Sequence, residues 1–95
     1  MATFVVLVKW TDKSFGLLKD PGAVAEDFKK TITSQGAKIK GWYLLMGRFD
    51  EICILEAPDA ATVVKILIPL CAKYGGKTET LQAFGEAEAK ALLRA

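Results

Sequence analysis

Four short stretches of the chain are rich in apolar and β-branched residues and end at polar or turn-forming ones. This pattern is typical of strands, and it falls on residues 3–10, 38–46, 51–57 and 77–84. In residues 3–10 and 51–57 both the odd and the even positions are apolar, which predicts that these two strands lie in the middle of a sheet. Residues 77–84 are the least apolar of the four and are predicted to form an edge strand.

The first helix is predicted between the first two strands, where apolar residues recur every four positions. Asp20 has a side chain that suits a helix N-cap, and Pro21 suits the first helical turn. Gly36 is predicted to end the helix. One face carries the apolar residues Val24, Phe28 and Ile32, and the opposite face is charged.

A second helix is predicted after the third strand, and a short helix over residues 86–93 follows the fourth. Asp59 is the predicted N-cap of the second helix, and Gly75-Gly76 is its predicted end. Pro69 is predicted to kink this helix or to end its first segment near Ile68. The apolar stripe of the helix consists of Val63, Ile66, Leu67, Leu70 and Tyr74.

The order strand, helix, strand, strand, helix, strand predicts an α+β fold of the ferredoxin-like kind, with residues 1–95 as a single domain. Two right-handed crossovers place the strands in the antiparallel order 4-1-3-2, with both main helices on one face of the sheet. The predicted elements leave the other face uncovered. We therefore predict that this face meets a second copy of the chain through an isologous contact.

The share of apolar residues also favours self-association. Of the 95 residues, 52% are hydrophobic, and a chain of this length buries only about two-thirds of the surface that its unfolded form exposes. Burial of the remaining apolar surface, at about 25 cal/mol per Å², favours a homodimer or a larger oligomer.

The charges and the two cysteines narrow the range of partners and compartments. The chain has 13 basic and 11 acidic residues, and the basic ones are scattered, so neither a nucleic-acid partner nor a membrane is predicted. Cys53 and Cys71 lack metal-ligand spacing and are predicted to be reduced, buried thiols. Neither a secretory signal nor a membrane span is recognised, so a soluble, cytoplasmic protein is expected.

The sequence contains no histidine and no asparagine. Histidine-based acid–base catalysis, cysteine–histidine nucleophiles and histidine-ligated haem, zinc or iron are therefore excluded. Two cysteines cannot hold a four-thiolate cluster, and no glycine-rich phosphate loop is present. No cofactor or metal is predicted, and a non-catalytic role is favoured over an enzymatic one.

The turn Gly47-Arg48-Phe49-Asp50 is the best candidate for a site, because it lies at the end of the predicted sheet where the first strand ends and the fourth begins. The side chains expected to gather there are Lys9, Trp10, Asp12, Arg48, Asp50 and Lys77. They suggest a small site for an anion or carboxylate, with Arg48 as a bidentate clamp held by Asp50, and Trp10 or Trp42 as an aromatic wall. The alternative is a turn without a ligand, in which Gly47 adopts a positive φ, Asp50 caps the turn and Arg48 is solvated.

Three aromatic residues and one more carboxylate complete the candidates. Trp42 and Tyr43 alternate along one strand, so one is predicted to pack under the helices and the other to meet the partner copy or a cavity. Tyr74 either closes the core or presents its hydroxyl at the rim of the site. Glu56 lies in an apolar strand and is either a buried carboxylate with a raised pKa or an exposed residue beside Pro58.

Three segments resemble the GYD-domain family, small bacterial and archaeal proteins of the dimeric α/β-barrel superfamily. They are FVVLVKWTD at residues 4–12, KIKGWYLLMGRFDEICILEAPD at residues 38–59 and KTETLQAF at residues 77–84. The Gly-x-Tyr-Asp motif of the family corresponds here to Gly47–Asp50, with Phe49 in place of the tyrosine. The resemblance implies the barrel-type fold and a dimer, but no established biochemical activity.

Three functions remain open at this stage. The favoured one is a homo-oligomer that binds a small ligand or regulates a partner, with a pocket between the helices and the sheet or at the dimer contact. The second is a small cofactor-independent enzyme, an isomerase or monooxygenase, that uses Arg48, Asp50 or Glu56 with a tryptophan. The third is a structural assembly module.

Overall fold

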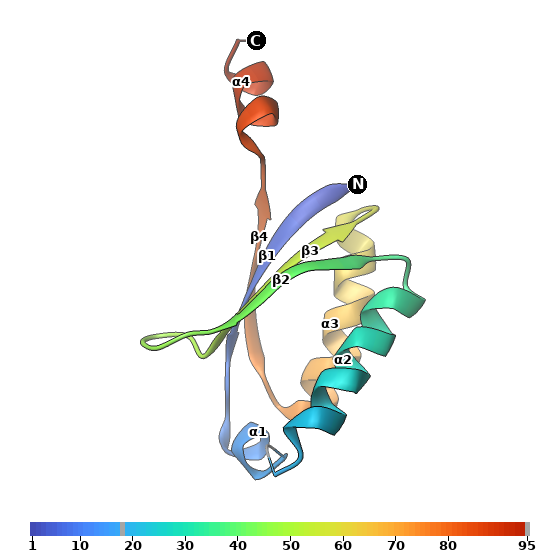
Figure 1. Cartoon of the computed structure of the whole chain (residues 1–95), viewed down its shortest axis with the longest axis vertical. Helices are drawn as coiled ribbons and strands as arrows, with labels where there is room; N and C mark the ends of the chain where they lie inside the picture. The colour runs from blue at the N-terminus through green and yellow to red at the C-terminus, as the bar shows by residue number, and fades with distance from the viewer. Residues whose placement is uncertain (18, 95) are drawn as a thin grey trace.

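The computed structural model describes residues 1–17 and 19–94, which form four strands and four helices (Figure 1). The strands are β1 (Ala2–Lys9), β2 (Lys38–Leu44), β3 (Glu51–Ala57) and β4 (Lys77–Ala83). They form one antiparallel sheet in the order β2-β3-β1-β4. The predicted ferredoxin-like fold and its strand order are therefore confirmed.

Two long helices, α2 (Pro21–Ser34) and α3 (Ala60–Tyr74), lie together on one side of the sheet (Figure 1). Both begin at the predicted N-caps. The Asp20 carboxylate accepts a hydrogen bond of 3.2 Å from the Ala23 amide, and the Asp59 carboxylate accepts one of 2.8 Å from the Thr62 amide.

Helix α3 runs without a break through Pro69, so the predicted end of a first segment near Ile68 is wrong. Pro69 lies on the exposed side of the helix, whereas the residues that hold it against the sheet are buried: Val63, Ile66 and Leu70. Their burial on both sides of the proline outweighs the loss of one backbone hydrogen bond. The helix ends at Gly75, whose φ of 77° is the left-handed cap that the sequence predicts.

A short helix, α1 (Asp12–Leu17), follows β1 and was not predicted from the sequence. It is held against the end of α3 by side chains that donate to backbone carbonyl groups there. The Ser14 hydroxyl donates to the Tyr74 carbonyl at 2.7 Å, and the Thr11 hydroxyl donates to the Gly75 carbonyl at 2.5 Å. These bonds satisfy carbonyl groups that have no partner within the last turn of α3.

The hydrophobic core lies between the sheet and the helices. It consists of Phe4, Val6, Ile32, Ala37, Leu55, Ala57, Val63, Ile66 and Leu70. Only one of these residues, Ile32, comes from α2, whereas three come from α3. The amino-terminal half of α2 is therefore less tightly packed against the sheet than α3.

The opposite face of the sheet is uncovered (Figure 1). We call it the open face. Its apolar side chains include Val5, Leu7, Ile52, Ile54 and Leu81, which neighbour one another in the strand register, and none of these five is buried. The last helix, α4 (Glu86–Arg94), extends away from the sheet beyond β4 and has no buried residue. Both features leave apolar groups in water.

Candidate functional site

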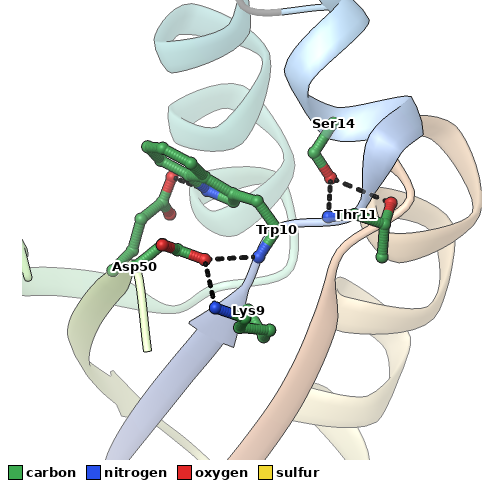
Figure 2. Close-up of polar contacts among 6 residues, drawn as sticks. Lys9, Trp10, Thr11, Ser14 and Asp50 are labelled. Carbon is green, nitrogen blue, oxygen red and sulfur yellow. Dashed lines mark hydrogen bonds and ion pairs between the residues drawn. The ribbon is translucent and has the colours of Figure 1, made fainter. Parts of the chain in front are cut away.

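Asp50 links the β2–β3 hairpin to the end of β1 (Figure 2). Its carboxylate accepts a hydrogen bond of 2.8 Å from the Trp10 backbone amide and lies 3.6 Å from the Lys9 ammonium group. Its own backbone amide donates to the Val8 carbonyl at 2.8 Å. Asp50 therefore fixes the position of the hairpin relative to β1, and it faces Lys9 rather than the arginine that the sequence suggested.

Arg48 lies over the ring of its neighbour Phe49, with 5.5 Å between the guanidinium carbon and the ring centroid. Within residues 1–17 and 19–94, no ion pair joins Arg48 to Asp50. Gly47 has a φ of 132°, the positive value that the turn requires. These features are those of the ligand-free alternative for this turn, with Arg48 exposed to solvent.

Lys77 and Asp12 lie at the same end of the sheet as Asp50. Lys77 is directly opposite Lys9 in the β1–β4 register, and Asp12 opens helix α1. The structure therefore brings Trp10, Asp50 and Lys77 to one end of the sheet, as the topology predicted. Whether these residues bind an anion stays a prediction.

Trp42 and Tyr43 occupy opposite faces of β2, as their alternation predicts. Trp42 is paired with Cys53 on the helix side of the sheet, and Tyr43 is paired with Ile52 on the open face. Trp42 is 50% exposed although it faces the helices. This exposure shows that the space between β2 and α2 is not filled by side chains.

Glu51 is the residue of this region that the sequence reasoning missed. It is only 8% exposed, and its carboxylate lies between two indole groups. The Trp10 indole N–H donates to it at 2.8 Å, and the Trp42 indole N–H donates to the other carboxylate oxygen at 3.4 Å. Glu56, which the sequence singled out, faces the other side of the sheet and pairs with Lys40 at 3.2 Å.

An open cavity of about 550 Å³ separates the amino-terminal half of α2 from the sheet. We call it the groove. Most of its walls are apolar, and Glu51 and Lys29 are the charged residues along it. Its other lining residues include Val6, Val8, Trp10, Val24, Phe28, Ile32, Ile39, Trp42, Leu44, Cys53, Leu55, Leu67 and Leu70. A cavity of this size, with few polar groups, has the character of a small-molecule site.

Cys53 lies next to Glu51 on the wall of the groove. Burial, and secondarily the negative charge of Glu51, raises the pKa of the Cys53 thiol to about 11. The thiol is therefore protonated at neutral pH and is a poor nucleophile. Both Cys53 and Cys71 are free thiols, and both are half-buried rather than fully buried.

Tyr74 closes the contact between α2 and α3 and does not line the Asp50 end of the sheet. Its ring packs against Phe28 at 5.4 Å between centroids, and its hydroxyl donates to the Asp27 carboxylate. Lys73 donates to the same carboxylate at 2.7 Å. The hydrogen bonds from Lys73 and then from Tyr74 hold the pKa of Asp27 below its usual range. This cluster has a structural role.

Two further properties of the described residues concern metal binding and membrane insertion. In the part of the chain that the structure describes, no three carboxylate or thiolate side chains come together as metal ligands. None of the helices in residues 1–17 and 19–94 is long and apolar enough to cross a membrane.

Comparison with known proteins identifies a family and one relative of the same length. The family described as "GYD domain" matches residues 4–93. A protein of Thermus thermophilus, named glutamine synthetase and cystathionine beta-lyase binding protein, is 33% identical over 95 residues. The match covers 99% of this chain and 100% of that protein.

A solved structure with a similar fold is the leucine response regulatory protein of Mycobacterium tuberculosis. The two structures superpose with a TM-score of 0.57 at 10% sequence identity. The match covers 88% of this chain but only 51% of that protein, so the chain spans about half of its length. At this identity the similarity shows the fold alone.

Proposed function

The chain belongs to the GYD-domain family, and from this membership we propose that it is a non-catalytic homo-oligomer that binds and regulates another protein. One observation carries the proposal, namely the open apolar face of the sheet. A monomer leaves Val5, Ile54 and Leu81 in contact with water, whereas a second copy placed on this face covers them.

The distribution of charge on the open face supports a contact between two copies. The centre of the face is apolar, and charged groups lie at its margins. These include Glu79 on β4, the ion pair of Lys40 with Glu56, and Lys9 opposite Lys77 at the end of the β1–β4 pair. An apolar centre with a polar rim is the usual anatomy of a protein interface.

The tip of the β2–β3 hairpin is the surface that we propose for the partner protein. The hairpin projects from the body of the molecule (Figure 1). Met46 at its tip is fully exposed, Leu45 is partly exposed, and Arg48 stacks on Phe49. Methionine, arginine and aromatic side chains are enriched at protein interfaces relative to the rest of the surface.

The Thermus thermophilus relative suggests the kind of partner. Its name describes the binding of glutamine synthetase and cystathionine beta-lyase, and it matches this chain over its full length. We therefore propose a metabolic enzyme as the partner of this protein, with these two enzymes as the first candidates. Such a partner implies that the protein works in the cytoplasm.

Surface plasmon resonance with the two purified enzymes tests this proposal. The wild-type chain is expected to bind at least one of them at micromolar concentrations, and Met46→Lys is expected to weaken the binding by about tenfold or more. Ile68→Lys is the matched control, because Ile68 is an exposed apolar residue of α3 on the helix side of the sheet. Absence of binding by the wild type, or equal losses in both variants, would contradict the proposed function.

The proposed function includes a small molecule that controls partner binding. Of the six residues that the sequence suggested for a ligand, Trp10 and Trp42 line the groove. Asp12, Arg48, Asp50 and Lys77 do not line it, and they stay a second, weaker candidate for an anion. We place the ligand in the groove, because the groove is a large, mostly apolar space and the Asp50 end is a contact between strands.

An enzymatic role has one feature in its favour, which is the buried carboxylate of Glu51 beside an apolar cavity. Two features oppose it. Both oxygens of Glu51 already accept indole N–H groups, and the neighbouring Cys53 thiol is protonated because its pKa is raised to about 11. We therefore retain the non-catalytic role.

A further inference from the structure

The negative charge of Glu51 is not balanced within the described residues. The Glu51 residue is 8% exposed, and its carboxylate accepts hydrogen bonds from the neutral indole groups of Trp10 and Trp42. Within residues 1–17 and 19–94, no lysine or arginine forms an ion pair with it. A buried charge without a counter-charge is unfavourable unless a partner supplies one.

The surroundings of this carboxylate define what such a partner must look like. The groove offers about 550 Å³ of space, bounded mostly by aliphatic and aromatic side chains. The two indole rings meet the carboxylate through their N–H edges, which hold it in place without neutralising its charge. Each carboxylate oxygen accepts one indole N–H and still has a lone pair free for another donor.

We propose that the groove binds an amphiphilic organic cation, a molecule with a primary or secondary ammonium group on an apolar alkyl or aryl body. The ammonium group supplies the missing positive charge and donates a charge-assisted hydrogen bond to Glu51. The apolar body fills the space between α2 and the sheet, where it contacts Phe28 and Leu67.

This assignment rests on the proposed function, which includes a small molecule bound in the groove, and it adds the chemical class of that molecule. It also separates the groove from the anion site that the sequence suggested. A carboxylate or phosphate ligand is repelled by Glu51, and Lys29, the other charged residue along the groove, pairs with Glu26 at 4.0 Å. The cations at the Asp50 end, Lys9 and Lys77, face away from the groove on the other side of the sheet. The two sites therefore select ligands of opposite charge.

Three probes of one shape and different charge test the inference on the full chain. They are 4-phenylbutylammonium, 4-phenylbutan-1-ol and 4-phenylbutanoate, and binding is measured by calorimetry and by tryptophan fluorescence. The ammonium probe is expected to bind about tenfold more tightly than the alcohol, and the carboxylate probe more weakly than both. Equal affinity of all three probes, or no binding of any of them, would overturn the inference. If helix α4 of a second copy fills the groove, none of the three probes binds.

Two matched variants assign the preference to one carboxylate. Glu51→Gln keeps the shape of the side chain and a hydrogen-bond acceptor for the Trp10 indole, but removes the charge. It is expected to bind the ammonium and alcohol probes with similar affinity. Glu56→Gln, a change in the same strand on the opposite face of the sheet, is expected to retain the full preference. If Glu51→Gln still binds the ammonium probe more tightly than the alcohol, the inference is contradicted. If this variant does not fold, the relative affinities of the three probes for the wild type test the inference alone.

The two proposals fail in distinguishable ways. Met46→Lys lies outside the groove, so it is expected to lose enzyme binding and to keep the ammonium preference. A wild-type protein that prefers the ammonium probe but binds neither enzyme contradicts the proposed function and leaves the ligand assignment standing. One that binds an enzyme and shows no probe preference contradicts only the ligand assignment.

Discussion

At the scale of single residues, the two tryptophans that donate to Glu51 differ in hydrogen-bond length and in exposure to solvent. Trp10 donates to Glu51 at 2.8 Å from a half-buried position, whereas Trp42 donates at 3.4 Å and is 50% exposed. A hydrogen bond to a buried charge is worth more when it is short and shielded from water. The hydrogen bond from Trp10 therefore stabilises the buried Glu51 carboxylate more than the bond from Trp42 does.

We predict that Trp10→Phe lowers the free energy of unfolding by about 1.5 to 3 kcal/mol, because the buried Glu51 carboxylate loses a donor. Trp42→Phe is the matched control, and its effect is expected to be less than about 1 kcal/mol, since water replaces the lost donor. Urea denaturation of the two variants and the wild type measures both values. Equal losses of unfolding free energy in the two variants would show that the shorter bond, from Trp10, does not stabilise the Glu51 carboxylate more than the longer one.

Cys53 gives a prediction about pH. Its pKa is raised from 9.0 in the unfolded chain to about 11 in the folded protein, so the folded state holds the thiol proton more tightly. The associated stability is fully present below pH 9 and is lost as the pH rises towards 11. The expected loss is about 2 kcal/mol over this interval.

Comparison with Cys53→Ala isolates this effect from other groups that titrate at high pH. The difference in unfolding free energy between wild type and variant is expected to shrink between pH 9 and pH 11. Urea denaturation under reducing conditions measures it. Curves that stay parallel over this interval would mean that Cys53 ionises as freely in the folded protein as in the unfolded chain.

The sequence predicted Trp10 and Trp42 as site residues but not the carboxylate between them. Both faces of β3 are apolar, with Ile52 and Ile54 on one parity and Cys53 and Leu55 on the other. This pattern does not indicate whether the odd or the even positions of β3 face the helices. It therefore does not predict whether Glu51 or Glu56 is the buried carboxylate. The two indole donors come from positions 41 and 9 residues away, and only the register of three strands brings them together.

At the scale of secondary-structure elements, the long strands and helices followed from the sequence, and α1 did not. Six residues are too few to form a stable helix alone, so periodicity gave no signal. A signal was nevertheless present in the order Trp10, Thr11, Ser14, Phe15. The Ser14 hydroxyl accepts from the Thr11 amide at 3.1 Å, and the rings of Trp10 and Phe15 pack edge to face at 5.6 Å. The first contact is one of the two bonds of a capping box, with Ser14 in the place of the usual Glu or Gln, and the ring contact is a hydrophobic staple.

The junction of α1 with the end of α3 predicts unequal effects at two glycines with nearly the same backbone. Gly36 and Gly75 have φ values of 76° and 77°. A Cβ on Gly36 meets nothing within 4 Å, whereas one on Gly75 lies 2.8 Å from side-chain atoms of both Lys13 and Thr11. An alanine is strained at both positions, but only at Gly75 does it also collide with a neighbouring element.

We therefore expect Gly36→Ala to cost about 1 kcal/mol of unfolding free energy and Gly75→Ala roughly 2 to 4 kcal/mol. Thermal or urea denaturation of both variants gives the comparison. Similar costs at the two positions would mean that α1 is not firmly docked on the end of α3.

At the scale of the whole molecule, the sequence predicted the topology because the two strands with apolar residues on both faces had to be central. The same reasoning predicted an open sheet face, which the structure contains. What the sequence did not predict is the groove, because its volume depends on how far α2 stands from the sheet. That distance is set by the few contacts of Ile32 and Phe28 rather than by any local pattern.

The open face and helix α4 leave the isolated chain with more exposed apolar surface than a stable monomer usually shows. Leu93 of α4 is 87% exposed, and Leu81 lies in the middle of the edge strand with half of its surface in water. Self-association through the open face is therefore the central claim about the whole molecule. Its energetic core is expected at Ile54, because this residue lies on the central strand β3.

Sedimentation equilibrium at micromolar concentration tests this claim most directly. The wild-type chain, whose monomer has a mass of 10.3 kDa, is expected to sediment as a dimer or a larger oligomer. Ile54→Lys is expected to weaken self-association by at least about tenfold, because it places charged groups in an apolar contact, and Ile68→Lys is expected to leave it unchanged. A wild-type protein that sediments as a single species of 10.3 kDa would contradict the account.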